Sequence, residues 1–213
     1  MLQIQKITNP EDAQNAYVIW QEGEHSAIVI DPSLQIKNIL YFLQEEALTC
    51  TAILLTHGHF DHIAGVEELR KQSGAPVYIH KNDAPMLIDS TKNGSAIMSK
   101  KPLLLQPAEQ LFLGDQQLLL CGLQVFAMHT PGHTVGSMCY RIENALFSGD
   151  TLFYLSIGRT DLPSGSEQDM HASLLRFREL EEDYEVYPGH AQSTQLSFEI
   201  ANNPFLGEEG WRL

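Results

Sequence analysis

The sequence predicts an α/β fold in which two sheets are covered by helices. In the first half of the chain, short apolar runs typical of strands alternate with amphipathic helical patterns. In the second half, several strand-like runs follow one another with turn residues between them, before helical patterns return. With 213 residues, of which 43% are hydrophobic and 19% charged, the chain has the size and composition of a single globular domain over residues 1–213.

The first half supplies the alternating elements. Strands are expected over 17–20, 27–30, 52–55 and 77–79. Asp31-Pro32 ends the second strand, because the residue before a proline avoids the helical region. The second and third strands are each followed by a helix, whose apolar faces are formed by Ile36, Ile39, Leu40 and Leu43, and by Ile63, Val66 and Leu69.

The second half is richer in strands. They are expected over 117–121, 124–128, 137–142 and 144–147, with hairpin turns between neighbours. Ser166 and Asp169 resemble a capping box at the start of a helix, and a last helix stops at Asn203-Pro204. The polar stretch 89–110 has no clear periodicity, so it is either a lid or a surface loop with a short helix.

A dense histidine motif, His57-Gly58-His59-Phe60-Asp61-His62, directly follows the apolar run 52–55. Unpaired imidazoles and carboxylates near a protein interior are costly, whereas a divalent cation would satisfy all of them. Three further apolar runs end at ligand-type residues, which are His133, Asp150 and His190. Together these residues are sufficient for two metal ions.

Composition and charge narrow the function classes. The formal charge of −14 disfavours nucleic acid or an anionic membrane surface as a partner, since both require clustered Lys and Arg. No run of about eighteen apolar residues occurs, and residues 1–6 lack a signal-peptide pattern. Cys50, Cys121 and Cys139 read as core residues in a reducing compartment. We therefore expect a cytoplasmic protein of unknown oligomeric state.

The ligand series from Asp31 to His190 resembles the metallo-β-lactamase superfamily, and the segment from Gly149 to Asp161 resembles its glyoxalase II-like hydrolases. The resemblance implies an αββα sandwich with two mixed sheets and a dinuclear centre. It assigns His57, His59 and His133 to the first ion, Asp61, His62 and His190 to the second, and Asp150 to a bridge between them. Asp31 would support the ligands, and Asp61 and Asp150 are the expected catalytic carboxylates.

The resemblance also implies a reaction. Two divalent ions, with zinc expected and iron or manganese as alternatives, would hold a bridging hydroxide that attacks a thioester such as S-lactoylglutathione. A thiolate leaves without strong protonation, since its conjugate acid has a pKa of about 8.5. Full-length glyoxalase II enzymes add a C-terminal helical domain that binds glutathione, whereas 23 residues follow His190 here. Smaller or different thioesters are therefore candidates as well.

Two other functions remain open. A persulfide dioxygenase would use one iron held by His57, His133 and Asp150, and relatives of that type share the run Gly158–Asp161. A non-catalytic metal-binding module is the third hypothesis. A secreted β-lactamase is disfavoured, because Asp150 stands where such enzymes carry a cysteine.

Candidate substrate contacts are Arg159, Tyr154 and the Lys100-Lys101 pair, because an anionic thiol carrier would need cations near an acidic rim. Each has a plainer alternative: Arg159 could pair with Asp161, Tyr154 could pack, and the lysines could be solvated. The four remaining histidines are expected to lie outside the metal centre, and they are His25, His80, His129 and His171.

Overall fold

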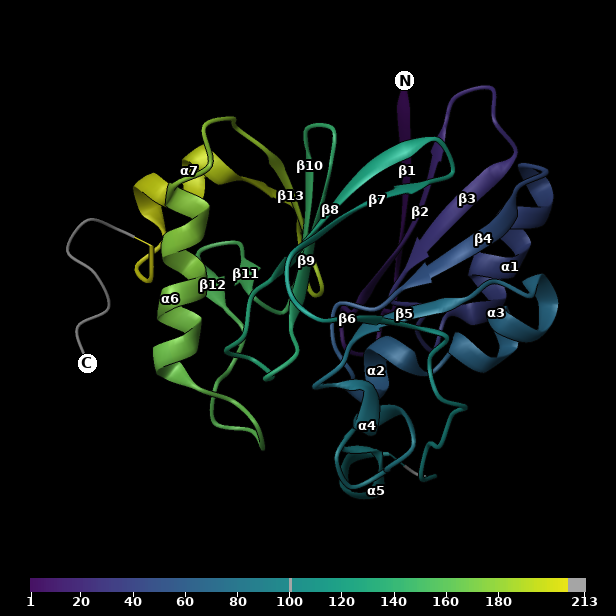
Figure 1. Cartoon of the computed structure of the whole chain (residues 1–213), viewed down its shortest axis with the longest axis horizontal. Helices are drawn as coiled ribbons and strands as arrows, with labels where there is room; N and C mark the ends of the chain where they lie inside the picture. Colours follow the sequence, from purple (N-terminus) through teal and green to yellow (C-terminus); the bar gives the residue numbers. More distant parts are fainter. Residues whose placement is uncertain (100, 207–213) are drawn as a thin grey trace.

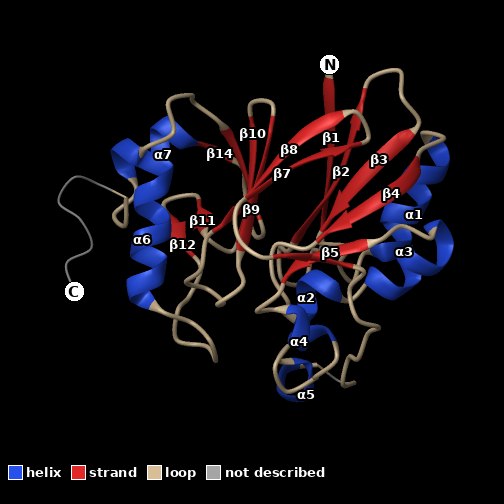
Figure 2. Cartoon of the chain, viewed as in Figure 1, coloured by secondary structure: helices blue, strands red, loops and turns tan. Residues whose placement is uncertain are grey.

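The computed structural model describes residues 1–99 and 101–206, and it contains two six-stranded sheets packed face to face. Figure 1 shows helices α1 and α3 outside the first sheet and helices α6 and α7 outside the second. The layers are therefore helix, sheet, sheet and helix, as Figure 2 makes plain in its colours. The predicted α/β class and αββα sandwich are confirmed.

The first sheet has the order β1-β2-β3-β4-β5-β6. Its strands are β1 (Leu2–Thr8), β2 (Asn15–Gln21), β3 (Ser26–Ile30), β4 (Thr49–Leu54), β5 (Val77–His80) and β6 (Gln110–Phe112). The first three strands are antiparallel, and β3 to β6 run parallel. Helices α1 (Ile36–Glu45) and α3 (Val66–Ser73) provide the parallel crossovers and cover one face.

The second sheet has the order β14-β13-β10-β9-β8-β7. Its strands are β7 (Gln116–Leu120), β8 (Leu123–His129), β9 (Met138–Ile142), β10 (Ala145–Gly149), β13 (Glu185–Pro188) and β14 (Thr194–Gln195). A small hairpin, β11 (Leu152–Phe153) with β12 (Ser156–Ile157), follows β10. Helices α6 (Glu167–Arg178) and α7 (Leu196–Asn202) cover this sheet, and the Ser166 hydroxyl caps α6 by accepting the Asp169 N–H.

The side-chain alternation of the strands separates the cores. Tyr17 and Ile19 of β2 pack between the sheets, whereas Val18 packs towards α1 and α3. Both faces of this strand are buried, as expected for a sheet enclosed between another sheet and helices. The two tyrosines of the central core use their hydroxyls as well: Tyr17 donates to the Pro188 carbonyl and Tyr140 to the Leu55 carbonyl. These bonds hold the ends of β13 and β4, where the ligand loops begin.

The structure differs from the sequence predictions at strand β1 and at the helix expected after β4. Strand β1 was not expected, although its Leu2 and Ile4 alternate with glutamines. The single helix expected through Ile63 and Leu69 is two helices, α2 (Phe60–Ile63) and α3, because the Gly65 N–H donates to Pro32 O instead of continuing the helix. The stretch 89–110 contains a short helix, α5 (Ser95–Met98), after α4 (Ala84–Leu87), which agrees with one of the two predictions for this stretch.

Lys100, one of the expected substrate contacts, and residues 207–213 lie outside the described residues. Within the described ranges, no helix combines the length and the apolar character needed to cross a membrane.

Candidate metal centre

All seven predicted ligands lie at one edge of the two sheets, each just beyond a strand end. Strand β4 leads to the His57–His62 motif, which continues into α2, and β8 leads to His133. Asp150 follows β10 and His190 follows β13. Strand ends that meet at one sheet edge are a common place for functional groups. The structure thus brings together residues that are widely separated in sequence.

Three imidazoles form the first half of the cluster. The ligand atoms of His57, His59 and His133 lie within 4.8 Å of one another. His59 Nδ1 is 2.9 Å from His133 Nε2. No carboxylate belongs to this group of three, although Asp150 Oδ2 is 3.5 Å from His133 Nε2.

The second half combines imidazoles with a carboxylate. Asp61, His62 and His190 form another group within 4.8 Å. His62 Nε2 is 3.2 Å from His190 Nε2, which in turn is 3.3 Å from Asp61 Oδ2. Asp150 lies between the halves, because its Oδ1 is 3.4 Å from His62 Nε2 while its Oδ2 faces His133. This is the position predicted for a bridging carboxylate.

Hydrogen bonds at the rear of the histidines decide which ring nitrogens face inward. His133 Nδ1 lies 2.8 Å from the Arg159 carbonyl, and His190 Nδ1 lies 3.0 Å from the Asp12 carbonyl. A carbonyl can only accept, so both Nδ1 atoms must carry the proton. In this orientation Nε2 of each ring points into the cluster, which is the arrangement of metal-binding histidines.

Asp31 supports the cluster from behind, as predicted. Its carboxylate accepts the Thr56 N–H at 2.8 Å, the Thr56 hydroxyl at 2.6 Å and the His62 Nδ1–H at 2.9 Å. Because the Thr56 hydroxyl donates to Asp31, its oxygen is left to accept from His57 Nδ1 at 3.0 Å. Asp31 is almost fully buried and has a φ of +49°, a backbone conformation that few non-glycine residues adopt outside constrained sites.

Asp83 is a second buried carboxylate, and the sequence reasoning missed it. Its Oδ2 accepts the Gly58 N–H at 3.1 Å and the Thr134 hydroxyl at 2.7 Å. One carboxylate thus joins the loop of His57 and His59 to the loop of His133. Burial raises the pKa of Asp83, and the hydrogen bond from Thr134 opposes that effect.

The two halves differ in protonation. Burial, together with the neighbouring His62 and His133, holds the pKa of His57 well below its usual value, and burial with His133 lowers that of His59 to about 4. Burial would also lower the pKa of His62, but the carboxylates of Asp150 and Asp61 raise it to about 10. The pKa of His190 is raised in the same way: burial opposes the rise, and the hydrogen bond to Asp61 drives it.

Two glycines make room for the ligands. Gly149 has a φ of +50°, and a Cβ there would lie 2.6 Å from the Thr56 side chain. A Cβ on Gly189 would lie 2.2 Å from Asp150 Oδ1 and 2.8 Å from the His62 ring. A side chain at either position would displace a ligand or its support.

The cluster fits divalent cations. Two buried polar atoms, His57 Nε2 and Asp150 Oδ1, have no hydrogen-bond partner, and facing imidazole lone pairs repel unless a cation lies between them. Nitrogen and carboxylate donors suit zinc, iron and manganese. His57, His59 and His133 would hold one ion, Asp61, His62 and His190 the other, and Asp150 would contact both.

A cavity of about 600 Å³ opens onto the cluster, and His59, Asp61, His133, Asp150 and His190 form its floor. Arg159 lines this cavity, yet its guanidinium is held by Asp161 in two hydrogen bonds of 2.7 and 2.8 Å, which is the plainer of the two predicted roles.

Two other predicted substrate contacts, Tyr154 and Lys101, do not line the cavity. Tyr154 stacks on Phe198 with a centroid distance of 5.6 Å, and Lys101 is exposed.

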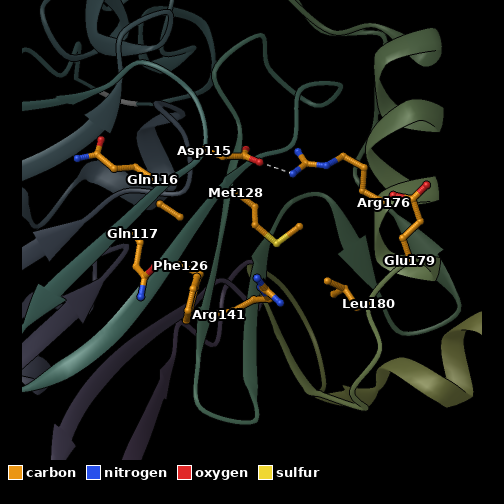
Figure 3. A pocket seen from close by; sticks show the side chains of 10 residues that line it. Asp115, Gln116, Gln117, Phe126, Met128, Arg141, Arg176, Glu179 and Leu180 are labelled. Atoms are coloured by element: carbon orange, nitrogen blue, oxygen red, sulfur yellow. Dashed lines mark hydrogen bonds and ion pairs between the residues drawn. The ribbon is translucent and has the colours of Figure 1, made fainter.

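A separate hollow of about 430 Å³ lies outside the second sheet, between β8, β9 and α6 (Figure 3). Met128 and Arg141 lie on its strand side, and Arg176 of α6 is paired with Asp115 at 2.5 Å. A third possible metal-binding group, His57, His62 and Asp150, joins the two halves of the cluster. In the described part of the chain, none of the three groups includes a residue of this hollow.

The remaining histidines and cysteines lie elsewhere, as predicted. His80 and His129 stack on each other with ring centroids 4.0 Å apart, and His25 Nδ1 bonds to the Ala47 carbonyl. Among the described residues, the three possible metal-binding groups contain no cysteine and none of the four excluded histidines. Cys50 and Cys139 are buried and free.

Comparisons with a family model and with known sequences agree on one family. The family model described as the Metallo-beta-lactamase superfamily matches residues 9–190. "Probable metallo-hydrolase YqgX" of Bacillus subtilis is 36% identical over 195 residues, covering 90% of this chain and 92% of that protein. A hydroxyacylglutathione hydrolase of Pelagibacter ubique is 31% identical over 185 residues, covering 85% and 68%.

Solved structures agree. The crystal structure of BLEG-1 B3 metallo-beta-lactamase superposes with a TM-score of 0.91 at 36% identity, covering 96% of this chain and 99% of that one. TTHA1623 in a di-iron-bound form gives a TM-score of 0.82 at 33% identity, covering 95% and 100%. ETHE1 from Myxococcus xanthus gives 0.77 at 28% identity, covering 96% and 84%.

Proposed function

The chain belongs to the metallo-beta-lactamase superfamily, and from that premise we propose that it is a dinuclear metal-dependent hydrolase that cleaves thioesters in the manner of glyoxalase II. The coarser part, a metal-dependent hydrolase, is supported by the family and by relatives such as YqgX. The observation that carries the finer part is the position of Asp150, whose Oδ1 lies near His62 and whose Oδ2 lies near both His133 and His190.

When bound, the two divalent ions would polarise the substrate carbonyl and lower the pKa of a water so that it can attack near neutral pH. The residues of the chain prepare this chemistry. The Arg159 and Asp12 carbonyls fix the tautomers of His133 and His190, and Asp31 orients His62. Asp150 and Asp61 add negative charge that favours cations in the second half. Fixed ligands of this kind require little reorganisation during the reaction.

A thioester suits this cluster because its leaving group needs no dedicated acid. Two residues named as substrate contacts do not supply such an acid: Arg159 is paired with Asp161, and Lys101 lies outside the cavity lining. A thiolate, with a conjugate acid pKa of about 8.5, departs unaided. The similarity to a hydroxyacylglutathione hydrolase also supports this reaction class.

We propose zinc as the resident metal, with iron or manganese as alternatives that the same donors accept. The likeness to a di-iron-bound protein supports two ions and keeps iron in consideration. A small-molecule thioester is the proposed partner. The net charge of −14 disfavours nucleic acid and anionic membranes.

A second candidate is the mononuclear iron persulfide dioxygenase. The likeness to ETHE1 supports it, and His57, His133 and Asp150 could hold one iron with open positions. The complete second half favours the dinuclear hydrolase.

The deciding experiment measures turnover of S-lactoylglutathione by metal-loaded protein, followed by loss of thioester absorbance. We expect hydrolysis that a chelator abolishes and added zinc restores. Oxygen uptake on glutathione persulfide, with no thioester turnover, would replace this proposal with the dioxygenase. If the protein binds stoichiometric metal but shows neither activity, the remaining hypothesis is a metal-binding module.

A further inference from the structure

Two large apolar side chains stand exposed beside the metal cluster. Ile97 is 86% exposed and Met98 66% exposed, and both line the 600 Å³ cavity whose floor is the ligand cluster. Phe60, inside the histidine motif, lines it too. Exposed apolar groups gathered at one cavity are a usual sign of a binding surface. We call Phe60, Ile97 and Met98 the apolar wall.

The apolar wall is anchored. The Phe60 N–H donates to the Asn93 carbonyl at 3.0 Å, and the buried Asn93 side chain donates to the Met86 and Leu103 carbonyls at 2.9 and 3.0 Å. A Cβ on Gly94 would contact both Met98 Sδ and the Phe60 ring, so these two side chains lie on either side of the same glycine. The segment that carries Ile97 is therefore held against the metal loop.

The rest of the cavity lining continues this apolar character. Phe153 and Ile157 come from the β11–β12 hairpin, and Leu162 and Pro163 from the segment before α6. Because these residues and the apolar wall line one cavity, an apolar group that extends from the cluster would be covered from both segments.

Lysine and arginine are scarce in the same cavity. Lys92 and Arg159 are the ones among its described lining, and Arg159 is already paired with Asp161. Asp12, Asp61 and Asp150 line it as well. A carrier with two carboxylates, such as glutathione, would find few unpaired positive partners here.

From these observations we propose that the substrates are thioesters with an apolar acyl chain, and that this chain lies against Ile97 and Met98. The inference rests on the proposed thioesterase function. It adds the class of acyl group and names two specificity-determining residues. Burying each methylene against the wall should raise kcat/KM by about two- to fourfold until the chain outgrows the cavity.

The test uses the metal-loaded full chain and acyl thioesters of N-acetylcysteamine, from acetyl to octanoyl. We expect kcat/KM to rise along the series, mainly because KM falls. The double variant Ile97→Ser/Met98→Ser should flatten the rise, so that its ratio of octanoyl to acetyl kcat/KM falls below that of the wild type. Both side chains are exposed, so the fold should tolerate the change.

Leu113→Ser is the matched control. Leu113 is 71% exposed, lies between β6 and β7, and is not part of the cavity lining. It should retain the full rise. A general effect of lost surface hydrophobicity would reduce the rise in Leu113→Ser as well. A loss of stability in the double variant would lower kcat/KM for the acetyl thioester as well.

The outcomes separate the two claims. Equal hydrolysis of all members, or an unchanged rise in the double variant, overturns the apolar wall and leaves the thioesterase in place. If no thioester is turned over, the proposed function fails, and calorimetric binding of ketone analogues, with methylene in place of sulfur, decides about the wall. Affinity that does not increase with chain length would then overturn it too.

Discussion

His59 and His62 belong to one six-residue motif, yet their surroundings shift their pKa values in opposite directions. Burial and the neighbouring His133 lower the pKa of His59 to about 4, whereas Asp150 and Asp61 overcome the effect of burial and raise that of His62 to about 10. The first half of the cluster is a group of imidazoles, and the second half joins imidazoles to a carboxylate.

This difference shows that the two halves attract a cation for different reasons. In the first half, His57 Nε2 has no hydrogen-bond partner, and His59 Nδ1 and His133 Nε2 share one hydrogen bond without a carboxylate in their group. In the second half, carboxylates already hold positive charge in the form of a proton on His62. A metal ion would therefore enter the first half directly and would have to displace a proton from the second.

The largest effect is expected from Asp150→Ala, which removes the group shared by both halves. We expect kcat/KM for thioester hydrolysis to fall by about three orders of magnitude, roughly 4 kcal/mol of transition-state stabilisation. Metal content, measured by elemental mass spectrometry, should fall too. Asp115→Ala, which breaks a distant pair with Arg176, should change neither quantity. Full metal content with normal turnover in Asp150→Ala would refute the bridge.

Removing one ligand from each half should separate them. His190→Ala should lose one ion and about a hundredfold in hydrolysis, because the second half then has two ligands of its own. His59→Ala should lose the other ion. A His190→Ala protein that kept one iron and oxidised persulfide at the normal rate would identify the dioxygenase instead.

A smaller effect is expected at Asp83, which supports only the first half. Asp83→Ala should weaken binding of the first ion by about ten- to a hundredfold, since Gly58 and Thr134 lose their common acceptor. Asp83→Asn keeps an acceptor oxygen and should recover most of the affinity. Titration with a chromophoric chelator measures both ions. Equal weakening of the two would show that Asp83 affects the fold in general.

The smallest effect is the dependence of metal affinity on pH. In the metal-free protein His62 has a raised pKa of about 10, so it is protonated near neutral pH and must release that proton on binding. Release of this proton should make the affinity of the second half rise by about tenfold per pH unit up to about pH 10, and the raised pKa of His190 adds to the rise at lower pH. His59, with a pKa of about 4, is already neutral, so the metal affinity of the first half should depend little on pH. The same pH dependence of metal affinity in both halves would contradict this difference in protonation.

Much of this arrangement could be predicted because the ligands are local in sequence. Apolar runs of strand length end directly before the histidine motif, Asp150 and His190, and their order specifies the family. Asp83 could not be found in this way. It lies in a short turn between β5 and α4, and its partners Gly58 and Thr134 are distant in sequence.

The apolar wall was missed for a related reason. Helices α4 and α5 have four residues each, which is too short for a helical period to be recognised. The polar residues around them, such as Asn93, are buried through tertiary contacts that the sequence pattern does not reveal. Strand β1 did carry a signal, the alternation of Leu2 and Ile4 with glutamines, and was overlooked.

Each half of the cluster takes ligands from loops of both sheets: His57 and His59 meet His133, and Asp61 and His62 meet His190. A bound ion would therefore act as a cross-link between the layers, which the unfolded chain cannot reproduce. By mass action, a hundredfold excess of free metal over its dissociation constant adds about 2.7 kcal/mol to the free energy of unfolding for one site. The free metal concentration in the cell would then control how long the folded chain survives proteolysis, as well as how fast it works.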